Sequence, residues 1–280
     1  MKNKLYSLLI ILSITTTLVM VMVYQAGAIG PKVSEPLNSH NLSASNAIPG
    51  FLYKATNDAV NNPRGQQICI FCHTPHSANV VGQTPLWNRA FSSENFQRYT
   101  SLTLKIRGIS GANYGDGALP NGSSKLCLSC HDGVSKLGAV YNGAPIIMLK
   151  DVIDSIASFK PSTNKMKSGH HPVSFVYTAA IASTITAAKA TAYQMPVLPE
   201  VKLDKQGRVQ CTTCHDAHQN QSFEDQCYAG TGNCTSPNTR KKAPFWVYGG
   251  GGSATADQQA VCTTCHPMNA GAGFTGPWPP

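Results

Sequence analysis

Cys211-Thr-Thr-Cys-His215 is one of four copies of the five-residue unit that decides how this 280-residue chain folds. Each unit has two cysteines separated by two residues and followed at once by a histidine. The other units are Cys69-Ile-Phe-Cys-His73, Cys127-Leu-Ser-Cys-His131 and Cys262-Thr-Thr-Cys-His266. At this spacing two thiols can form thioethers with the vinyl groups of one haem while the histidine binds its iron. The units therefore predict four covalently bound c-type haems.

Structural zinc sites are the alternative, because zinc knuckles also use cysteine pairs at this spacing. Zinc does not require a histidine after every pair, and the chain has only 9 histidines. Four such coincidences have a chance of roughly one in a million, which favours haem. The predicted thioether residues are Cys69, Cys72, Cys127, Cys130, Cys211, Cys214, Cys262 and Cys265, and the predicted proximal iron ligands are His73, His131, His215 and His266.

The spacers between the units predict little regular structure. They are rich in Gly, Pro, Asn, Ser and Thr, and none has enough periodic apolar sequence to form its own core. Haems are large and apolar, so we expect them to supply that core. The predicted fold is mostly irregular coil with a few short helices and small β-hairpins, wrapped around a chain of four covalently bound haems in a single tetrahaem cytochrome c domain over residues 29–280. Residues 146–159 and 177–193 are the possible helices, and residues 201–209 predict a hairpin that turns at Asp204 to Gly207.

The N-terminus is typical of a secretory signal peptide over residues 1–28. Two lysines precede an apolar run over residues 5–24, and the small residues Ala26-Gly-Ala28 follow it. A retained membrane anchor is the alternative, because the run is nearly long enough to span a bilayer. The signal peptide predicts export across the inner membrane with no transmembrane anchor after processing. Haem is attached covalently outside the cytoplasm, so we expect an extracellular or cell-surface location, with the periplasm as the alternative.

Cys227 and Cys234 lie outside the four units, six residues apart in a polar segment. An exported chain favours a local disulfide between them, and a free or intermolecular thiol pair is the alternative.

The formal net charge of +9 raises the possibility of a nucleic-acid or membrane-surface partner. No run of lysine and arginine and no basic patch with interleaved aromatic residues supports it, and anionic haem propionates would offset much of the excess. We therefore predict no nucleic-acid partner. Charged residues make up only 12% of the chain, about half the usual share, which favours assembly with other subunits.

Five further histidines are enough to give each iron a second histidine; they are His40, His76, His170, His171 and His218. His76 and His218 each follow a proximal histidine by three residues. A side chain that close cannot reach the opposite face of the same porphyrin, but it can reach the iron of a neighbouring haem. This spacing predicts haems packed in close pairs, as electron transfer requires.

Several longer strings resemble multihaem c-type cytochromes of metal-reducing bacteria, and most nearly the tetrahaem subunits that polymerise into extracellular cytochrome nanowires. The strings are Cys69-Ile-Phe-Cys-His-Thr-Pro-His76, Pro85-Leu-Trp-Asn88, Cys127-Leu-Ser-Cys-His-Asp-Gly133, His171-Pro-Val173 and Gly207-Arg-Val-Gln-Cys-Thr-Thr-Cys-His-Asp-Ala-His218. The resemblance implies two histidines on every haem and a continuous haem chain. It implies the distal ligands His40, His76, His171 and His218, with His170 as a substitute for its neighbour.

The leading functional prediction is electron transfer without substrate chemistry, by a subunit that associates head to tail into an extracellular filament. Other redox proteins or extracellular electron acceptors would be its partners. The alternatives are a monomeric periplasmic shuttle, a multihaem reductase and a membrane-anchored quinol oxidase subunit. A reductase needs an iron with an open position, and five available distal histidines argue against one. His40 can serve either a haem of the next subunit or one of its own, and the sequence leaves both open.

Overall fold

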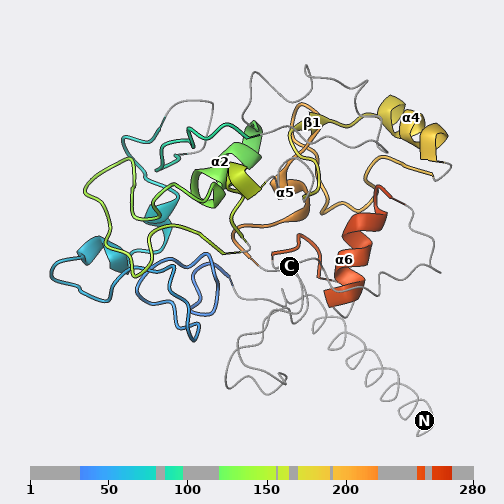
Figure 1. The fold of residues 1–280 in the computed structure, drawn as a ribbon. Coiled ribbons are helices and arrows are strands. Elements are labelled where there is room, and N and C mark those ends of the chain that lie inside the picture. The colour runs from blue at the N-terminus through green and yellow to red at the C-terminus, as the bar shows by residue number, and fades with distance from the viewer. Residues whose placement is uncertain are drawn as a thin grey trace, which may run out of the picture.

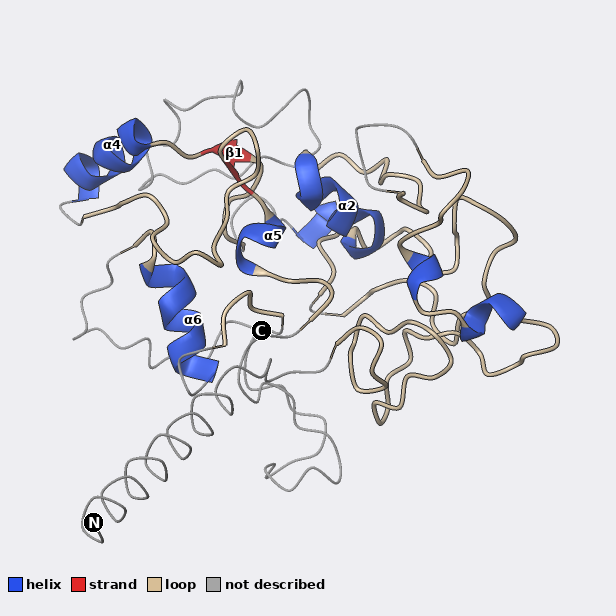
Figure 2. Ribbon diagram, turned by 180° about the vertical axis from the view of Figure 1, so that it is seen from behind, coloured by secondary structure: helices blue, strands red, loops and turns tan. Residues whose placement is uncertain are grey.

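The computed structural model describes residues 32–79, 86–96, 120–155, 157–163, 170–189, 192–219, 245–249 and 254–266. Coil and turn make up most of this backbone (Figures 1 and 2). The described helices are all short: η1 Pro63–Gln66, η2 Cys69–Phe71, α2 Gly122–His131, η5 Pro161–Thr163, α4 Ala179–Lys189, α5 Cys211–Cys214 and α6 Ala254–Thr263. One two-residue antiparallel ladder joins β1 Phe175–Val176 to β2 Arg208–Val209.

Every cysteine unit begins on a helix. The first starts at η2, the second occupies the end of α2, the third forms α5 and the fourth lies at the end of α6. One helical turn brings residues three apart to the same face, so this local structure points both thiols of a unit in one direction. The side chain of Gln210 accepts a hydrogen bond from the Thr213 backbone, and the Thr213 hydroxyl accepts one from the Gln210 backbone, which fixes the start of α5.

The prediction of a helix over residues 146–159 is wrong. The described part of this segment runs beside residues 52–56 instead: Ala55 and Met148 form a bridge, and the Leu149 N–H donates to the Lys54 carbonyl at 2.8 Å. Partner backbone groups in the neighbouring segment satisfy the hydrogen bonds that a helix would have formed internally. The helix predicted over residues 177–193 exists in shorter form as α4.

The hairpin over residues 201–209 is only half confirmed. Its turn is present, because the Gly207 N–H donates to the Asp204 carbonyl at 2.9 Å and Gly207 has a φ of +72°. The Asp204 carboxylate also accepts the Arg208 N–H at 2.8 Å. The strand that leaves the turn, however, pairs with β1, which lies more than thirty residues earlier.

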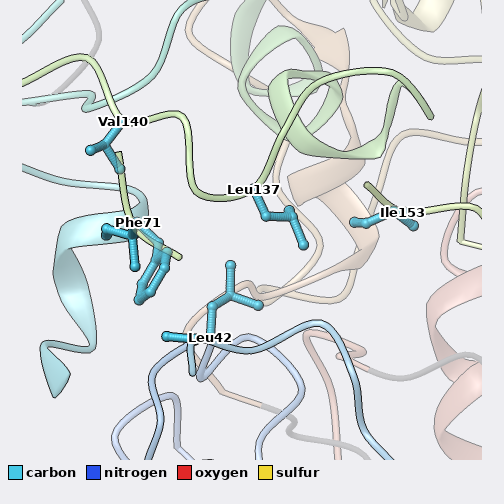
Figure 3. Close-up of a cluster of buried hydrophobic side chains, with 7 residues drawn as sticks. Leu42, Phe71, Leu137, Val140 and Ile153 are labelled. Carbon is cyan, nitrogen blue, oxygen red and sulfur yellow. The ribbon is translucent and has the colours of Figure 1, made fainter. Parts of the chain in front are cut away.

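The buried apolar side chains form four separate clusters, and each of them meets a cysteine of the units. The first contains Leu42, Phe71 and Leu137, whose side chains converge in Figure 3, and Cys72 and Cys130 pack against it. The other three clusters are centred on Phe175, Phe96 and Trp246, and they contact Cys265, Cys211 and Cys214 respectively. The apolar interior is therefore divided among the attachment units.

Arg89 ties the segment after the first unit to the second unit. Its side chain is 2% exposed and donates to the carbonyls of Ser129, Lys136 and Leu137 at 3.2, 2.7 and 2.8 Å. Because Arg89→Met leaves these buried carbonyls without their donor, we expect it to lower the free energy of unfolding by roughly 3–5 kcal/mol. Denaturant unfolding followed by circular dichroism measures this loss. Arg64→Met is the control, since Arg64 is only half-buried; an equal loss in both variants would contradict the argument.

In the described segments no helix is long and apolar enough to cross a membrane. The predicted signal peptide over residues 1–28 and the predicted disulfide between Cys227 and Cys234 lie outside these segments.

Candidate functional site

Three of the four histidines predicted as proximal ligands face a second histidine that is distant in sequence. The pairs are His73 with His218, His131 with His40 and His266 with His171, and their ring centres are 6.1, 6.2 and 6.0 Å apart. The angles between the ring planes are 14°, 80° and 89° respectively. The tertiary structure thus brings together His40, His171 and His218, each predicted as a distal ligand, with one proximal histidine apiece.

The separation of the rings distinguishes among the ways in which two histidines can be paired. An imidazole nitrogen binds a metal at about 2 Å, so two rings on opposite sides of one metal have centres roughly 6 Å apart. Two ligands of a tetrahedral zinc, or two rings joined by a direct hydrogen bond, have centres only about 5 Å apart. The observed 6.0–6.2 Å fits ligands on opposite sides of one metal, as haem iron requires.

Backbone carbonyls orient three of these rings. The Nδ1 atoms of His40, His131 and His171 lie 3.0, 2.9 and 2.8 Å from the carbonyl oxygens of Ala217, Ala157 and Pro172. A carbonyl oxygen only accepts, so each Nδ1 carries the proton and donates it. The lone pair on Nε2 is then available for a metal, which is the usual arrangement of a metal-binding histidine.

The fourth proximal histidine, His215, stacks on Trp246 with ring centres 4.9 Å apart. His170 lies close enough to His215 for their charges to interact, and its ring packs edge-on against Phe159 at 4.7 Å. This proximity makes His170 the candidate second ligand of the third unit, on the strength of that charge interaction and not of a ring separation. The resemblance made it only a substitute for His171, whereas the fold points the two neighbours toward different units.

His76 departs from the predicted ligand set. Its side chain is exposed, and no other histidine ring contacts it in the part of the chain that the structure describes. Only its backbone carbonyl is engaged, by Thr74 Oγ1 and Asn142 Nδ2, both at 2.8 Å. The histidines that lie beside predicted proximal ligands are therefore His40, His170, His171 and His218, and a ligand role for His76 stays a prediction.

Burial favours the neutral form of four of these histidines. It lowers the pKa of His131 and His171, and it lowers the pKa of His170 and His266 to about 4. The neutral imidazole is the form that binds a metal.

The lowered pKa values have a consequence for acid stability. In the unfolded chain these histidines bind protons at about pH 6.5, whereas folded His170 and His266 resist protonation down to about pH 4. The unfolded state therefore binds more protons within this window, and stability falls as the pH falls through it. In acid titration of the protein made without haem attachment, followed by circular dichroism, we expect the folded signal to persist at about pH 5 and to be lost near pH 4. Loss near pH 6.5 would contradict the burial argument.

Several of the cysteine thiols also lie in apolar surroundings. Burial raises the pKa of Cys72 and Cys214 to about 12 and that of Cys265 to about 11. Zinc binds the thiolate, which such surroundings disfavour, while a thioether carries no charge. All eight cysteines of the units are free of disulfides, and the described residues contain no group of three or more side chains able to hold a metal ion. At Cys72, Cys214 and Cys265 burial thus favours a neutral thioether over a zinc-bound thiolate, whereas a hydrogen bond from Cys127 lowers the pKa of Cys211.

The four units are neighbours in space. Cys72 and Cys130 pack against the same apolar cluster, so the first unit adjoins the second. Cys214 packs against the cluster that contains Val261, the residue before Cys262, so the third unit adjoins the fourth. The Cys127 thiol donates a hydrogen bond to Cys211, which joins the second unit to the third. The third unit also adjoins the first, because His218 follows it and faces His73.

Gln210 fixes the contact between the second and third units. Its buried side chain accepts hydrogen bonds from Ser124 and Ser174 at 2.6 and 3.1 Å and donates to Asn121 at 3.0 Å. A Cβ atom at Gly122, where φ is +56°, would lie 2.6 Å from its amide nitrogen. The glycine thus allows the close approach of α2 and α5 that Figures 1 and 2 show.

No family model and no curated protein sequence matches this chain. Its function is therefore inferred from its own residues.

Proposed function

We propose that this chain is a tetrahaem c-type cytochrome that transfers electrons between haems carrying a histidine on each side. The observation that carries the proposal is the set of three histidine pairs, each beside a cysteine unit, with ring centres 6.0–6.2 Å apart. When bound, haem supplies reversible one-electron chemistry at its iron.

The residues that would hold the haems follow from the pairs. The first unit uses Cys69 and Cys72 with His73 and His218, and the second uses Cys127 and Cys130 with His131 and His40. The third unit uses Cys211 and Cys214 with His215 and His170, and the fourth uses Cys262 and Cys265 with His266 and His171.

The protein's own groups suit electron transfer better than substrate chemistry. A second histidine opposite each proximal one occupies the position that a reductase keeps open for its substrate. Carbonyl oxygens at 2.8–3.0 Å hold three of the rings in one orientation. Ligands held in a fixed orientation change little when an electron arrives. The adjoining units also support a short route from one unit to the next.

We further propose that the exported protein works outside the cell as a subunit of a head-to-tail filament, with other redox proteins or extracellular electron acceptors as partners. The support is its resemblance to nanowire subunits and its low share of charged residues, 12%. His40 lies beside His131 of its own chain, which favours a ligand role within one subunit over a link between subunits. A monomeric periplasmic shuttle is the other form that the same electron-transfer chemistry allows.

The test is expression with the haem-attachment machinery, followed by mass spectrometry and paramagnetic resonance. We expect four covalently bound haems, all low-spin and six-coordinate in the oxidised protein. A strong high-spin signal, or tight binding of carbon monoxide or cyanide by the native protein, would favour the reductase instead. Electron microscopy of the secreted fraction then separates filaments from dispersed particles.

A further inference from the structure

The first and third units share an arrangement that extends beyond their cysteines. The proximal histidines His73 and His215 each form a backbone bridge with a tryptophan, Trp87 and Trp246. In both places the sequence Pro-x-Trp supplies the tryptophan, and the residue before it has a positive φ: Leu86 at 52° and Phe245 at 67°.

The hydrogen bonds around the two tryptophans match position by position. The residue after each proximal histidine donates its N–H to the residue before the tryptophan: Thr74 to Leu86 at 2.9 Å, and Asp216 to Phe245 at 2.7 Å. The residue after each tryptophan donates to the second cysteine of the unit: Asn88 to Cys72 at 2.8 Å, and Val247 to Cys214 at 3.0 Å. Bulky residues adopt a positive φ only where the surrounding structure imposes it. Its repetition therefore indicates that both units constrain the backbone before the tryptophan in the same way.

The indole N–H is the group that both arrangements leave without a partner. Trp87 and Trp246 are 8% and 6% exposed, and the Nε1 atom of each is buried with no hydrogen-bond partner among the described residues. Most buried donors in native proteins are paired, because leaving one unpaired is costly. Two orphaned donors at equivalent positions therefore indicate an acceptor outside the described part of the polypeptide.

The position of the rings identifies that acceptor. Each indole lies against a proximal histidine, with ring centres 5.8 Å apart for Trp87 and His73 and 4.9 Å apart for Trp246 and His215. Each therefore borders the space where a unit would hold its haem. The porphyrin nitrogens bind the iron, so the free acceptors that a haem brings are its propionate carboxylates. An indole N–H only donates, and a carboxylate is the stronger kind of acceptor.

We infer that Trp87 and Trp246 each donate the indole N–H to a propionate carboxylate of the haem held by the adjoining unit. This inference rests on the proposed function. It makes the two tryptophans positioning residues that orient the first and third haems, and it explains why the Pro-x-Trp sequence follows these two units.

The test uses the full haem-loaded protein with carbon-13 in the propionate carboxyl groups, introduced through labelled 5-aminolevulinate. In Trp87→Phe we expect about one-eighth of the labelled carboxylate intensity in the infrared difference spectrum to move to higher frequency, because one of eight carboxylates loses its donor. Trp246→Phe should shift a second, separate portion of the labelled carboxylate intensity to higher frequency, and the double variant should shift both portions.

A matched control and an isosteric variant keep the result clear. Tyr177→Phe removes a buried hydroxyl that already donates to the Gln194 carbonyl at 2.9 Å, and it should leave the labelled carboxylate band unchanged. Benzothienylalanine at position 87 replaces only the N–H by sulfur and keeps the shape of the ring, so it should reproduce the shift even where Trp87→Phe folds poorly. An unchanged carboxylate band in the isosteric variant overturns the inference and indicates water as the acceptor. Absence of haem from the wild-type protein would instead overturn the proposed function.

Discussion

Replacing any one of His40, His170, His171 and His218 by alanine is expected to convert one haem in four from low-spin to high-spin. Each of these histidines lies by a different proximal histidine, so each variant should leave one iron with a single protein ligand. The cysteines are untouched, so mass spectrometry should still find four haems. Quantitative paramagnetic resonance of the oxidised protein measures the converted fraction, expected at about a quarter of the iron.

His76→Ala is the matched control for this series. Its side chain is exposed and contacts no other histidine in the described segments, so every haem should stay low-spin. The result separates the ligand set that the resemblance implied from the set that the fold favours. If His76→Ala created a high-spin haem while His170→Ala did not, the assignment of His170 to the third unit would be wrong.

Removal of the third unit by Cys211→Ala with Cys214→Ala should interrupt electron transfer more severely than removal of any other unit. This unit adjoins the second through Cys127, the fourth through the cluster that contains Val261, and the first through His218. We expect the variant to carry three haems and to pass electrons from the fourth haem to the other two several orders of magnitude more slowly, because tunnelling falls exponentially with distance. Laser-triggered reduction followed by absorption spectroscopy measures the rate.

The double variant Cys262→Ala with Cys265→Ala is the control, since it also removes one haem. The fourth unit adjoins only the third in the described structure, so its loss leaves the contacts among the other three in place. Electron exchange among the remaining haems should then stay fast. Equal slowing in both variants would show that the third unit is not the junction.

The chemistry proposed for the chain comes from the sequence alone, because it depends on short covalent spacing. Two thiols and an imidazole within five residues suit one haem whatever the rest of the fold does. The predominance of coil followed in the same way from spacers without periodic apolar sequence, and the helix α4 from its own residues. The turn at Asp204 to Gly207 is also local, since an aspartate and a glycine form it by themselves.

Only the tertiary structure decided which segments meet. The segment 146–159 satisfies its backbone through residues 52–56, and β2 pairs with a strand more than thirty residues away, so local propensity could not predict either arrangement. The histidine pairs likewise depend on contacts between segments that are distant in sequence. His40 meets His131 across ninety residues, and the neighbours His170 and His171 turn toward different units. A histidine has the same chemistry wherever it lies in the sequence, and its partner is set by long-range packing, which is why the sequence alone could count the ligands but not pair them.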